Sequence, residues 1–436
     1  MTVTLEPLER ALLSLRRHLL PFLFLLYVIA YLDRVNVSFA AAGVSRDLGL
    51  NSASYGLAAG IFFLGYVLFE IPSNLILARV GARRWIGRIL LTWGVIAAWM
   101  AFMTTAAQFN GLRLLLGVAE AGFFPGIILY LSQWVPEGHR ARTLAGFMLA
   151  IPVAGLLGGP VSAALLSMHG LLGLAGWRWL FLLEALPAIV LAFLVWRWLP
   201  NRPHQASWLQ PVEAEALEQV LAQEREQRQA SAGHIQGLAA LWGDRRLWLL
   251  AVLYLGIATS FYGFSFWIPR FVGDALAQQS PSPAVVNLLS AIPYGLAVVA
   301  MLLVGRSADR HADKRLFVAI PLAVAAVALA LSIAAAGPLR LVLISLSTAA
   351  AFSSLGPAWA IPLQFLGGQA AAGGIAAINS FGNIGGFLAP FVMGRLMLRP
   401  QGDSLALAYL AGVLLISAVL ALLATQHRGA AEPLNA

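Results

Sequence analysis

The sequence predicts an all-α integral membrane protein with twelve transmembrane helices in two pseudo-symmetric six-helix bundles. Of its 436 residues, 60% are hydrophobic and 11% are charged, whereas soluble domains carry about 25% charged residues. Apolar runs recur along the chain, each close to the roughly 20 residues that a helix needs to cross a bilayer. Short alternating segments that would predict a membrane β-barrel are not found.

The apolar runs define the predicted spans, and one long polar segment separates the sixth run from the seventh. The spans are expected at residues 19–42, 53–77, 85–106, 109–134, 143–167, 177–199, 247–271, 284–305, 316–336, 340–363, 370–397 and 404–425. This pattern divides the chain into an N-terminal segment (1–18), a first bundle (19–199), a linker (200–243), a second bundle (244–425) and a C-terminal tail (426–436). Within the linker, Leu217, Val220 and Leu221 are spaced as on one face of an amphipathic helix.

Basic residues outnumber acidic ones, 28 to 19, and their placement predicts topology. Most lie before the first span, in 79–88, in 197–246 and in 306–315, whereas the alternate loops carry few. This positive-inside bias places both termini in the cytoplasm and predicts no nucleic-acid partner. The chain has no cysteine, which excludes thiolate metal sites, and no metal or other cofactor is expected.

An acid and a base stand side by side in the middle of the first span, at Asp33 and Arg34. A charge at such depth costs roughly 2.5–3.5 kcal/mol on insertion scales and usually marks a transport pathway. The alternative is that the two residues only neutralise each other, although helix neighbours point about 100° apart.

The fourth span adds Arg113 and Glu120, seven residues apart on one helix face. Counting about 1.5 Å per residue places Arg34 and Glu120 both near the bilayer midplane. These charges are therefore predicted to share a cavity between the two bundles, where transporters bind substrate.

Arginine offers a planar fork that matches a carboxylate, so Arg34 is predicted to bind a substrate carboxylate. Arg113 is expected to assist it or to hold Glu120. Asp33 and Glu120 are the proton-coupling candidates, because an arriving anion would release an acid from arginine for protonation. A static pair between Glu120 and Arg113 is the structural alternative.

The remaining polar residues at depth have weaker assignments. Asn379 and Asn383, at positions i and i+4, suit substrate hydroxyls or interhelical hydrogen bonds. Glu70, close to the cytoplasmic end of its span, is a gating candidate, and Glu184 is expected to form a structural pair with Arg178. The substrate-binding candidates of lower weight are Tyr31, Tyr262 and Gln364.

A weak internal repeat supports the two-bundle prediction. Residues 78–84 follow the second span and residues 309–315 follow the eighth, an offset of 309 − 78 = 231 residues, about half of the chain. Arg79 in the first copy and Asp309 and Arg310 in the second are predicted to act in gating.

Six ordered motifs give the chain a resemblance to the major facilitator superfamily and, within it, to the anion:cation symporter family. The motifs are Tyr31–Asn36, Arg113–Gly126 with its extension to Pro136, Gly176–Glu184, the linker stretch Ala206–Leu209 with Glu213 and Glu215, Tyr262–Pro269, and Asn379–Gly386. The bacterial organic-acid permeases, for tartrate, phthalate, hydroxyphenylacetate and sugar acids, look most similar. The resemblance implies the major facilitator fold, a substrate-binding role for Arg34 and a location in the bacterial inner membrane.

One departure from the family concerns the first cytoplasmic loop. The superfamily motif has glycine and aspartate where this chain has Asn74 and Ala78, although the second copy keeps Gly305 and Asp309. The acid that usually latches the first loop is therefore missing.

The predicted function is uptake of a small organic anion together with protons, by alternating access, with one chain as the transport unit in the lipid bilayer. A proton-coupled exporter on the same fold is the first alternative, which loop charge does not distinguish from uptake. A membrane-embedded enzyme would need a nucleophile–base or metal constellation at depth, which the sequence does not offer. A sensor would need a larger soluble domain than residues 200–243 provide.

Overall fold

The computed structural model describes residues 5–232, 243, 245–311, 313–363 and 368–424. In these ranges the chain is helical with short connections and contains no β-strand. Eleven described helical segments are long and apolar enough to cross a membrane. The one remaining predicted span, at 370–397, corresponds to α18 (Gly368–Leu396), whose 29 residues pack along both α3 and α12. The structure thus confirms the predicted all-helical membrane fold.

The first half of the molecule comprises six spanning segments, several of them built from two consecutive helices. They are α1 (Leu5–Ser14) and α2 (Leu20–Leu48), α3 (Ser52–Val80), α4 (Ala82–Trp99), α5 (Ala106–Glu120) with α6 (Phe123–Ser132), α7 (Glu137–Met148) with α8 (Ala150–Leu166), and α9 (Gly176–Trp198).

The second half follows the linker helix α10 (Pro211–Ala232) and has a corresponding set of segments. They are α12 (Arg245–Ala275), α13 (Pro283–Leu289) with α14 (Ala291–Asp309), α15 (Leu316–Ala334), α16 (Gly337–Ser353) with α17 (Leu355–Leu363), α18, and α19 (Gly402–Leu423).

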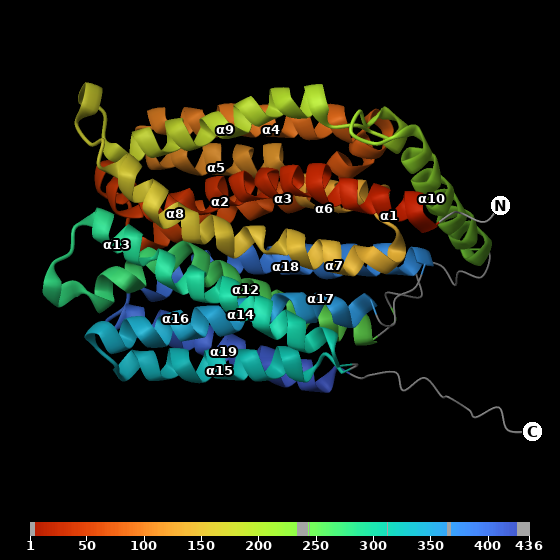
Figure 1. Ribbon diagram of the computed structural model, residues 1–436. Helices are drawn as coiled ribbons and strands as arrows, with labels where there is room; N and C mark the ends of the chain where they lie inside the picture. The colour runs from red at the N-terminus through yellow and green to blue at the C-terminus, as the bar shows by residue number, and fades with distance from the viewer. Residues whose placement is uncertain (1–4, 233–242, 244, 312, 364–367, 425–436) are drawn as a thin grey trace, which may run out of the picture.

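The two halves lie side by side along their length, with the first half above the second in Figure 1. Helix α2 begins and α19 ends at the same end of the bundle, which also carries α10 and is called the terminal end below. The opposite end, called the far end, carries the connections from α8 to α9 and from α12 to α13.

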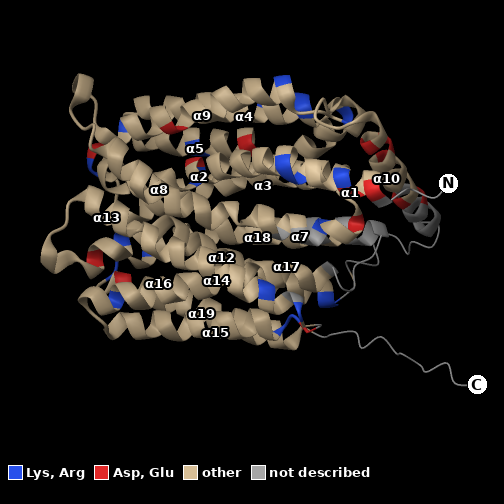
Figure 2. Ribbon diagram, viewed as in Figure 1, with Lys and Arg blue, Asp and Glu red and all other residues tan. Residues whose placement is uncertain are grey.

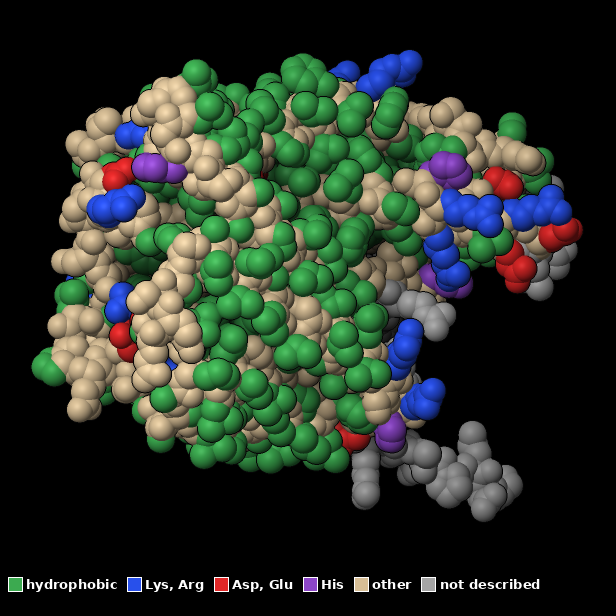
Figure 3. Space-filling model, turned by 60° about the vertical axis from the view of Figure 1, so that its left-hand side comes forward, with side chains coloured by type: hydrophobic (Ala, Val, Ile, Leu, Met, Phe, Trp, Pro, Cys, Tyr) green, Lys and Arg blue, Asp and Glu red, His purple; other side chains and the backbone are tan. Residues whose placement is uncertain are grey.

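Apolar side chains cover most of the face of the helical body that Figure 3 shows. Large hydrophobic residues on the outer faces, among them Leu68, Ile71 and Ile416, are more than half exposed. Charged residues lie mainly near the two ends of the bundle, apart from a small group within the helices of the first half (Figure 2). An apolar surface this continuous is far larger than water-soluble monomers tolerate and suits contact with lipid.

The fourth span is interrupted, although the sequence predicts one continuous helix there. The break falls at Ala121 and Gly122, and Gly122 has a left-handed φ of +83°. A Cβ at this glycine would lie 2.3 Å from Oγ of Ser73 on α3, so both the turn and the close approach require glycine. Because of this break, α5 ends at Glu120.

Close packing joins the two halves toward the far end, where α3 begins and α18 ends. A Cβ at Gly56 would lie 2.1 Å from the carbonyl oxygen of Pro390, and one at Gly394 would lie 2.4 Å from that of Ser52. Small residues of this kind let helix backbones approach within a membrane. Nearby, Arg270 donates hydrogen bonds to Ser52, at 3.1 Å, and to Asp403, at 2.9 Å.

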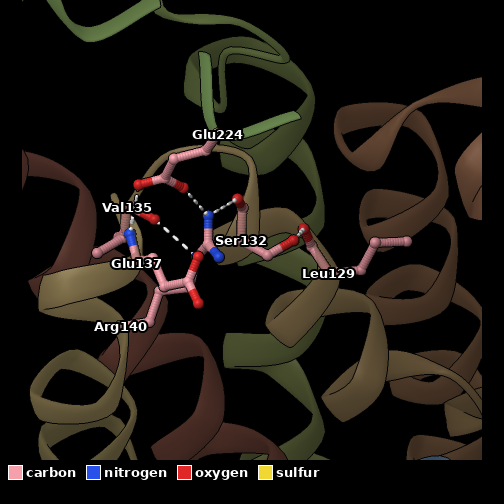
Figure 4. Close-up of polar contacts among 6 residues, drawn as sticks. All are labelled: Leu129, Ser132, Val135, Glu137, Arg140 and Glu224. Atoms are coloured by element: carbon pink, nitrogen blue, oxygen red, sulfur yellow. Dashed lines mark hydrogen bonds and ion pairs between the residues drawn. The ribbon is translucent and has the colours of Figure 1, made fainter. Parts of the chain in front are cut away.

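The linker helix α10 is fastened to the first half at the terminal end (Figure 4). Glu224 accepts hydrogen bonds from the backbone N–H of Glu137, at 2.7 Å, and from Arg140, at 2.8 Å. Arg140 also donates to the carbonyls of Val135 and Ser132. The apolar face predicted for this helix is confirmed by Leu217 and Leu221, which are buried, whereas Val220 is half-buried.

The junction between α3 and α4, at Gly81, is held without an acid at Ala78. Asn201, just after α9, accepts a hydrogen bond from the backbone N–H of Arg83, at 3.0 Å, and the Arg83 side chain donates to the carbonyl of Leu199. In the loop before α15, hydrogen bonds from Arg315 hold the pKa of Asp313 below its usual range. The side chain of Asp309 lies outside the described residues.

Candidate functional site

A cavity of about 570 Å³, part of it open to solvent, lies between the two halves. Its walls come from α2, α3, α6, α7 and α8 on one side and from α12, α17 and α18 on the other. Aromatic side chains dominate the lining, and within the described part of the chain Arg34 is its one charged member. The most important lining residues are Tyr31, Arg34, Tyr66, Tyr254, Tyr262, Trp359, Asn379 and Asn383.

Arg34 lies at the boundary between the cavity and the interior of the first half. Its guanidinium forms an ion pair with Glu120, and Nη1 lies 3.4 Å from the hydroxyl of Tyr262 on the second half. The rings of Phe62 and Tyr66 lie 5.3 and 5.4 Å from the guanidinium carbon, within cation–π range. Nε is buried and has no hydrogen-bond partner among the described residues. The arginine is therefore held in place by Glu120 and the surrounding aromatic rings, while one of its N–H donors is unused.

Glu120 terminates α5 at the helix break and is 1% exposed. It does not line the cavity, so Arg34 stands between it and any bound anion. A buried carboxylate needs a charge partner, and here the partner is the same side chain that faces the cavity. The geometry makes Glu120 and a cavity anion competitors for one guanidinium.

The sequence suggested that Arg113 could hold Glu120, but the structure shows no such contact. It is fully buried on α5, and its guanidinium donates to the carbonyls of Ala58, at 3.2 Å, and Ala59, at 3.1 Å, on α3. Seven residues of helix separate it from Glu120 by roughly 10 Å along the axis. The static Glu120–Arg113 pair that was the structural alternative is therefore absent, and Glu120 pairs with Arg34 instead.

Asp33 points away from Arg34, into the interior of the first half, so the two neighbours do not neutralise each other. Nε1 of Trp93 on α4 donates to one of its oxygens at 2.6 Å, and the amide of Asn36 donates to the other at 3.5 Å. Asp33 is 2% exposed and is absent from the cavity lining. Sequence analysis did not single out Trp93, although its place inside an apolar span could have suggested a buried partner.

The second half contributes polar groups rather than charges. Both asparagines on α18 bind Glu70 of α3 across the interface: Asn379 donates to Oε1 at 2.8 Å and Asn383 donates to Oε2 at 3.2 Å. Tyr31 lies 3.0 Å from the hydroxyl of Ser265 on α12, another contact between halves. Glu70 is not itself among the lining residues, but it thus binds two residues that are.

The fold and the cavity between two halves agree with the similarity of this chain to known proteins. The model of the Major Facilitator Superfamily matches residues 23–390, most of the chain. The chain belongs to this superfamily. It is a multi-pass membrane transporter and not an enzyme.

Two bacterial transporters are similar to this chain over most of its length. A protein of Agrobacterium vitis named "Putative tartrate transporter" is 45% identical over 424 residues, covering 97% of this chain and 92% of that protein. A "Quinolone resistance transporter" of Acinetobacter baumannii is 39% identical over 92% of this chain and 91% of that protein.

Solved structures confirm the major facilitator fold. A bacterial homologue of the human lysosomal transporter Spinster, crystallised in an inward-facing and occupied conformation, superposes with a TM-score of 0.73. It is 16% identical in sequence and covers 94% of this chain and 96% of that structure.

The other predicted site residues of this transporter lie apart from the cavity or outside the described residues. Arg79 and Arg310 are exposed near the terminal end. Gln364 falls outside the described residues, as does the side chain of Asp309. No cluster of three or more metal-ligating side chains occurs in the part of the chain that the structure describes.

The expected pair between Glu184 and Arg178 is not formed. Arg178 instead donates to the carbonyls of Ala101, at 2.5 Å, and Met103, at 3.3 Å. Glu184 lies inside the first half, where Ser162 on α8 donates to Oε1 at 3.3 Å. The two residues are six apart on α9, more than one and a half turns, so they face different neighbours.

Proposed function

We propose that this transporter carries a small organic anion into the cell together with protons, by alternating access of the cavity to the two sides of the bacterial inner membrane. The observation that carries the proposal is the position of Arg34, whose guanidinium faces the cavity on one side and pairs with buried Glu120 on the other. A carboxylate substrate would bind the guanidinium through charge-assisted hydrogen bonds.

Coupling follows from this competition. When a substrate carboxylate occupies Arg34, Glu120 loses part of its compensating charge inside a low-dielectric environment and takes up a proton. When the proton leaves, Glu120 recovers Arg34 and the substrate is released. The proton gradient alone supplies the driving force in this scheme, without a cofactor, and one chain contains the complete unit.

The names of the relatives suggest the substrate class. Tartrate has two carboxylates and two hydroxyls, and the cavity offers one guanidinium, two asparagine amides and several tyrosine hydroxyls. These groups suit a hydroxy dicarboxylate, with Arg34 taking one carboxylate. The excess of basic residues in the loops of the terminal end supports cytoplasmic termini.

Proteoliposomes would test the proposal with labelled tartrate, an aldonate, phthalate and hydroxyphenylacetate under an inwardly directed proton gradient. Accumulation of at least one acid, abolished by a protonophore and lost in Glu120→Gln, is the expected result. Gradient-driven accumulation that persists unchanged in Glu120→Gln would overturn the role of that residue.

Export of an organic anion is the second candidate, because one close relative is named for quinolone resistance. The same vesicles distinguish the two directions. An exporter exchanges protons for substrate, so the inward proton gradient would drive substrate out of loaded vesicles against its gradient, whereas the symporter would accumulate substrate inside under that same gradient.

A further inference from the structure

Glu184 is a buried carboxyl group that has no basic partner among the described residues. It is 7% exposed, its Oε1 accepts one hydrogen bond from Ser162, and its Oε2 is buried with no hydrogen-bond partner among the described residues. An ionised carboxylate in this position would leave an oxygen without a donor in an apolar interior, which is strongly unfavourable.

Asn36 links Glu184 to Asp33. Its amide donates to Asp33 at 3.5 Å and also lies against the Glu184 carboxyl. Asp33 receives a second, shorter hydrogen bond from Trp93, at 2.6 Å. Asp33 thus has one short N–H donor in Trp93, as suits an ionised carboxylate, whereas Glu184 has only longer contacts with the Ser162 hydroxyl and the Asn36 amide.

The elements packed against α9 bring no cation to this pair. Helix α8 has no charged residue, and the basic groups of α2, α4 and α9 are engaged elsewhere or lie toward the ends of the bundle. Arg34 pairs with Glu120 and Arg178 binds backbone carbonyls. The other charged residues on these helices are Arg46 and Asp47 at the far end and Arg83, Arg84, Arg88 and Arg197 toward the terminal end.

Depth in the membrane distinguishes the two acids. Glu184 is eight residues from the far-end start of α9, about 12 Å, whereas Asp33 is fifteen residues from the far-end terminus of α2, about 22 Å. Ser162 is four residues from the end of α8, about 6 Å. Ser162, Glu184, Asn36 and Asp33 therefore form a polar file that leads from near the far end toward the middle of the first half.

We propose that Asp33 and Glu184 share one proton, that Glu184 carries it in this conformation, and that Glu184 exchanges it with the far side. When the proton leaves Oε2 of Glu184 and an oxygen of Asp33 accepts it, the pair keeps one negative charge and the Asn36 amide donates to whichever acid is ionised. The role of this proton in transport rests on the proposed function. The presence of the proton on Glu184 does not depend on that function.

Infrared difference spectroscopy of the purified full-length protein in lipid nanodiscs tests the proton directly. A pH titration should show the C=O stretch of a protonated buried carboxyl in the wild type, and this band should disappear in Glu184→Gln. The matched control is Glu213→Gln on the linker helix, which should leave the band unchanged. A wild-type band that is unaltered in Glu184→Gln would overturn the proposal.

Transport measurements on the same variants test the exchange. Glutamine keeps the shape of Glu184 and its contact with Ser162, so a purely structural residue would tolerate it. We expect Glu184→Gln to shift the pH profile of uptake and to reduce proton-driven accumulation by about tenfold, while substrate counterflow stays within about twofold. Unchanged accumulation and an unchanged pH profile would exclude the exchange role. If the wild type shows no proton-driven transport, the proposed function fails, and the infrared band still decides whether Glu184 carries a proton.

Discussion

The guanidinium of Arg34 and the carboxylate of Glu120 form an ion pair at the inner wall of the cavity, between a helix from the first span and the broken end of the fourth. Both side chains are almost fully buried. Breaking such a pair without replacing either charge is costly, and for this reason the proposed mechanism pairs the binding of a ligand to Arg34 with neutralisation of Glu120.

Replacement of Arg34 by lysine tests the role of the planar fork. Lysine keeps the positive charge beside Glu120 but cannot present two parallel N–H donors to a carboxylate. We expect Arg34→Lys to weaken substrate binding by about 10- to 100-fold, the equivalent of one charged hydrogen bond. Isothermal titration with the transported acid would measure this, and full affinity in Arg34→Lys would contradict the assignment.

Arg113 is expected to affect stability rather than substrate affinity, because its guanidinium satisfies two backbone carbonyls of α3. Arg113→Met removes two hydrogen bonds to carbonyls that keep their partners within α3, at a cost of about 0.5–1.5 kcal/mol for each. The melting temperature of the purified protein should fall, while the substrate Kd of the folded fraction stays near the wild-type value. Normal stability combined with lost binding would instead place Arg113 in the site.

Glu70 is predicted to hold the two halves together at the cavity wall through Asn379 and Asn383. The chain has no native cysteine, so a cysteine introduced at cavity-lining Ala258 can be labelled without background. Glu70→Ala should increase its labelling rate about fivefold or more, because two interhelical hydrogen bonds are lost. Glu70→Gln keeps an acceptor and a donor for the asparagine amides and should label at nearly the wild-type rate. Equal rates in all three proteins would show that the contact does not restrain the halves.

Gly56 is predicted to be required for closure of the far end. A methyl group there would lie 2.1 Å from the Pro390 carbonyl, so α3 and α18 could not approach as closely. In a variant with cysteine at Ala291, which is buried against Gly159, Gly56→Ala should increase labelling from the far side and slow transport.

The matched control for that experiment is Gly412→Ala on α19, where an added Cβ meets nothing within 4 Å. It should leave both labelling and transport unchanged. If Gly56→Ala behaves like this control, the close approach of α3 and α18 does not govern access.

The linker helix contact should be measurable as a coupling energy between Glu224 and Arg140, whose side chains are mostly buried. A double-mutant cycle with Glu224→Gln and Arg140→Gln should give about 1 kcal/mol, more than an exposed pair would give. Thermal unfolding in detergent would measure it, and additive effects of the two substitutions would show that the ion pair contributes nothing.

The sequence by itself determined the spans, the two-half organisation and the short list of charged residues at depth. These features depend on local properties: the length of an apolar run fixes a helix that crosses the membrane, and any charge inside it stands out. Asp33, Arg34, Arg113 and Glu120 were recognised for this reason, and the fold was predicted correctly.

Only the tertiary structure decided which of these residues meet. The break at Gly122 ends α5 at Glu120. The orientation of α2 about its axis places Asp33 against Trp93 and Arg34 against Glu120. Because α3 packs closely on α5, Arg113 donates to two of its carbonyls. Glu184, expected beside Arg178, lies instead near Asn36. The physical reason is that partner choice depends on how each helix is turned and how closely it packs, and side chains from distant parts of the chain set both.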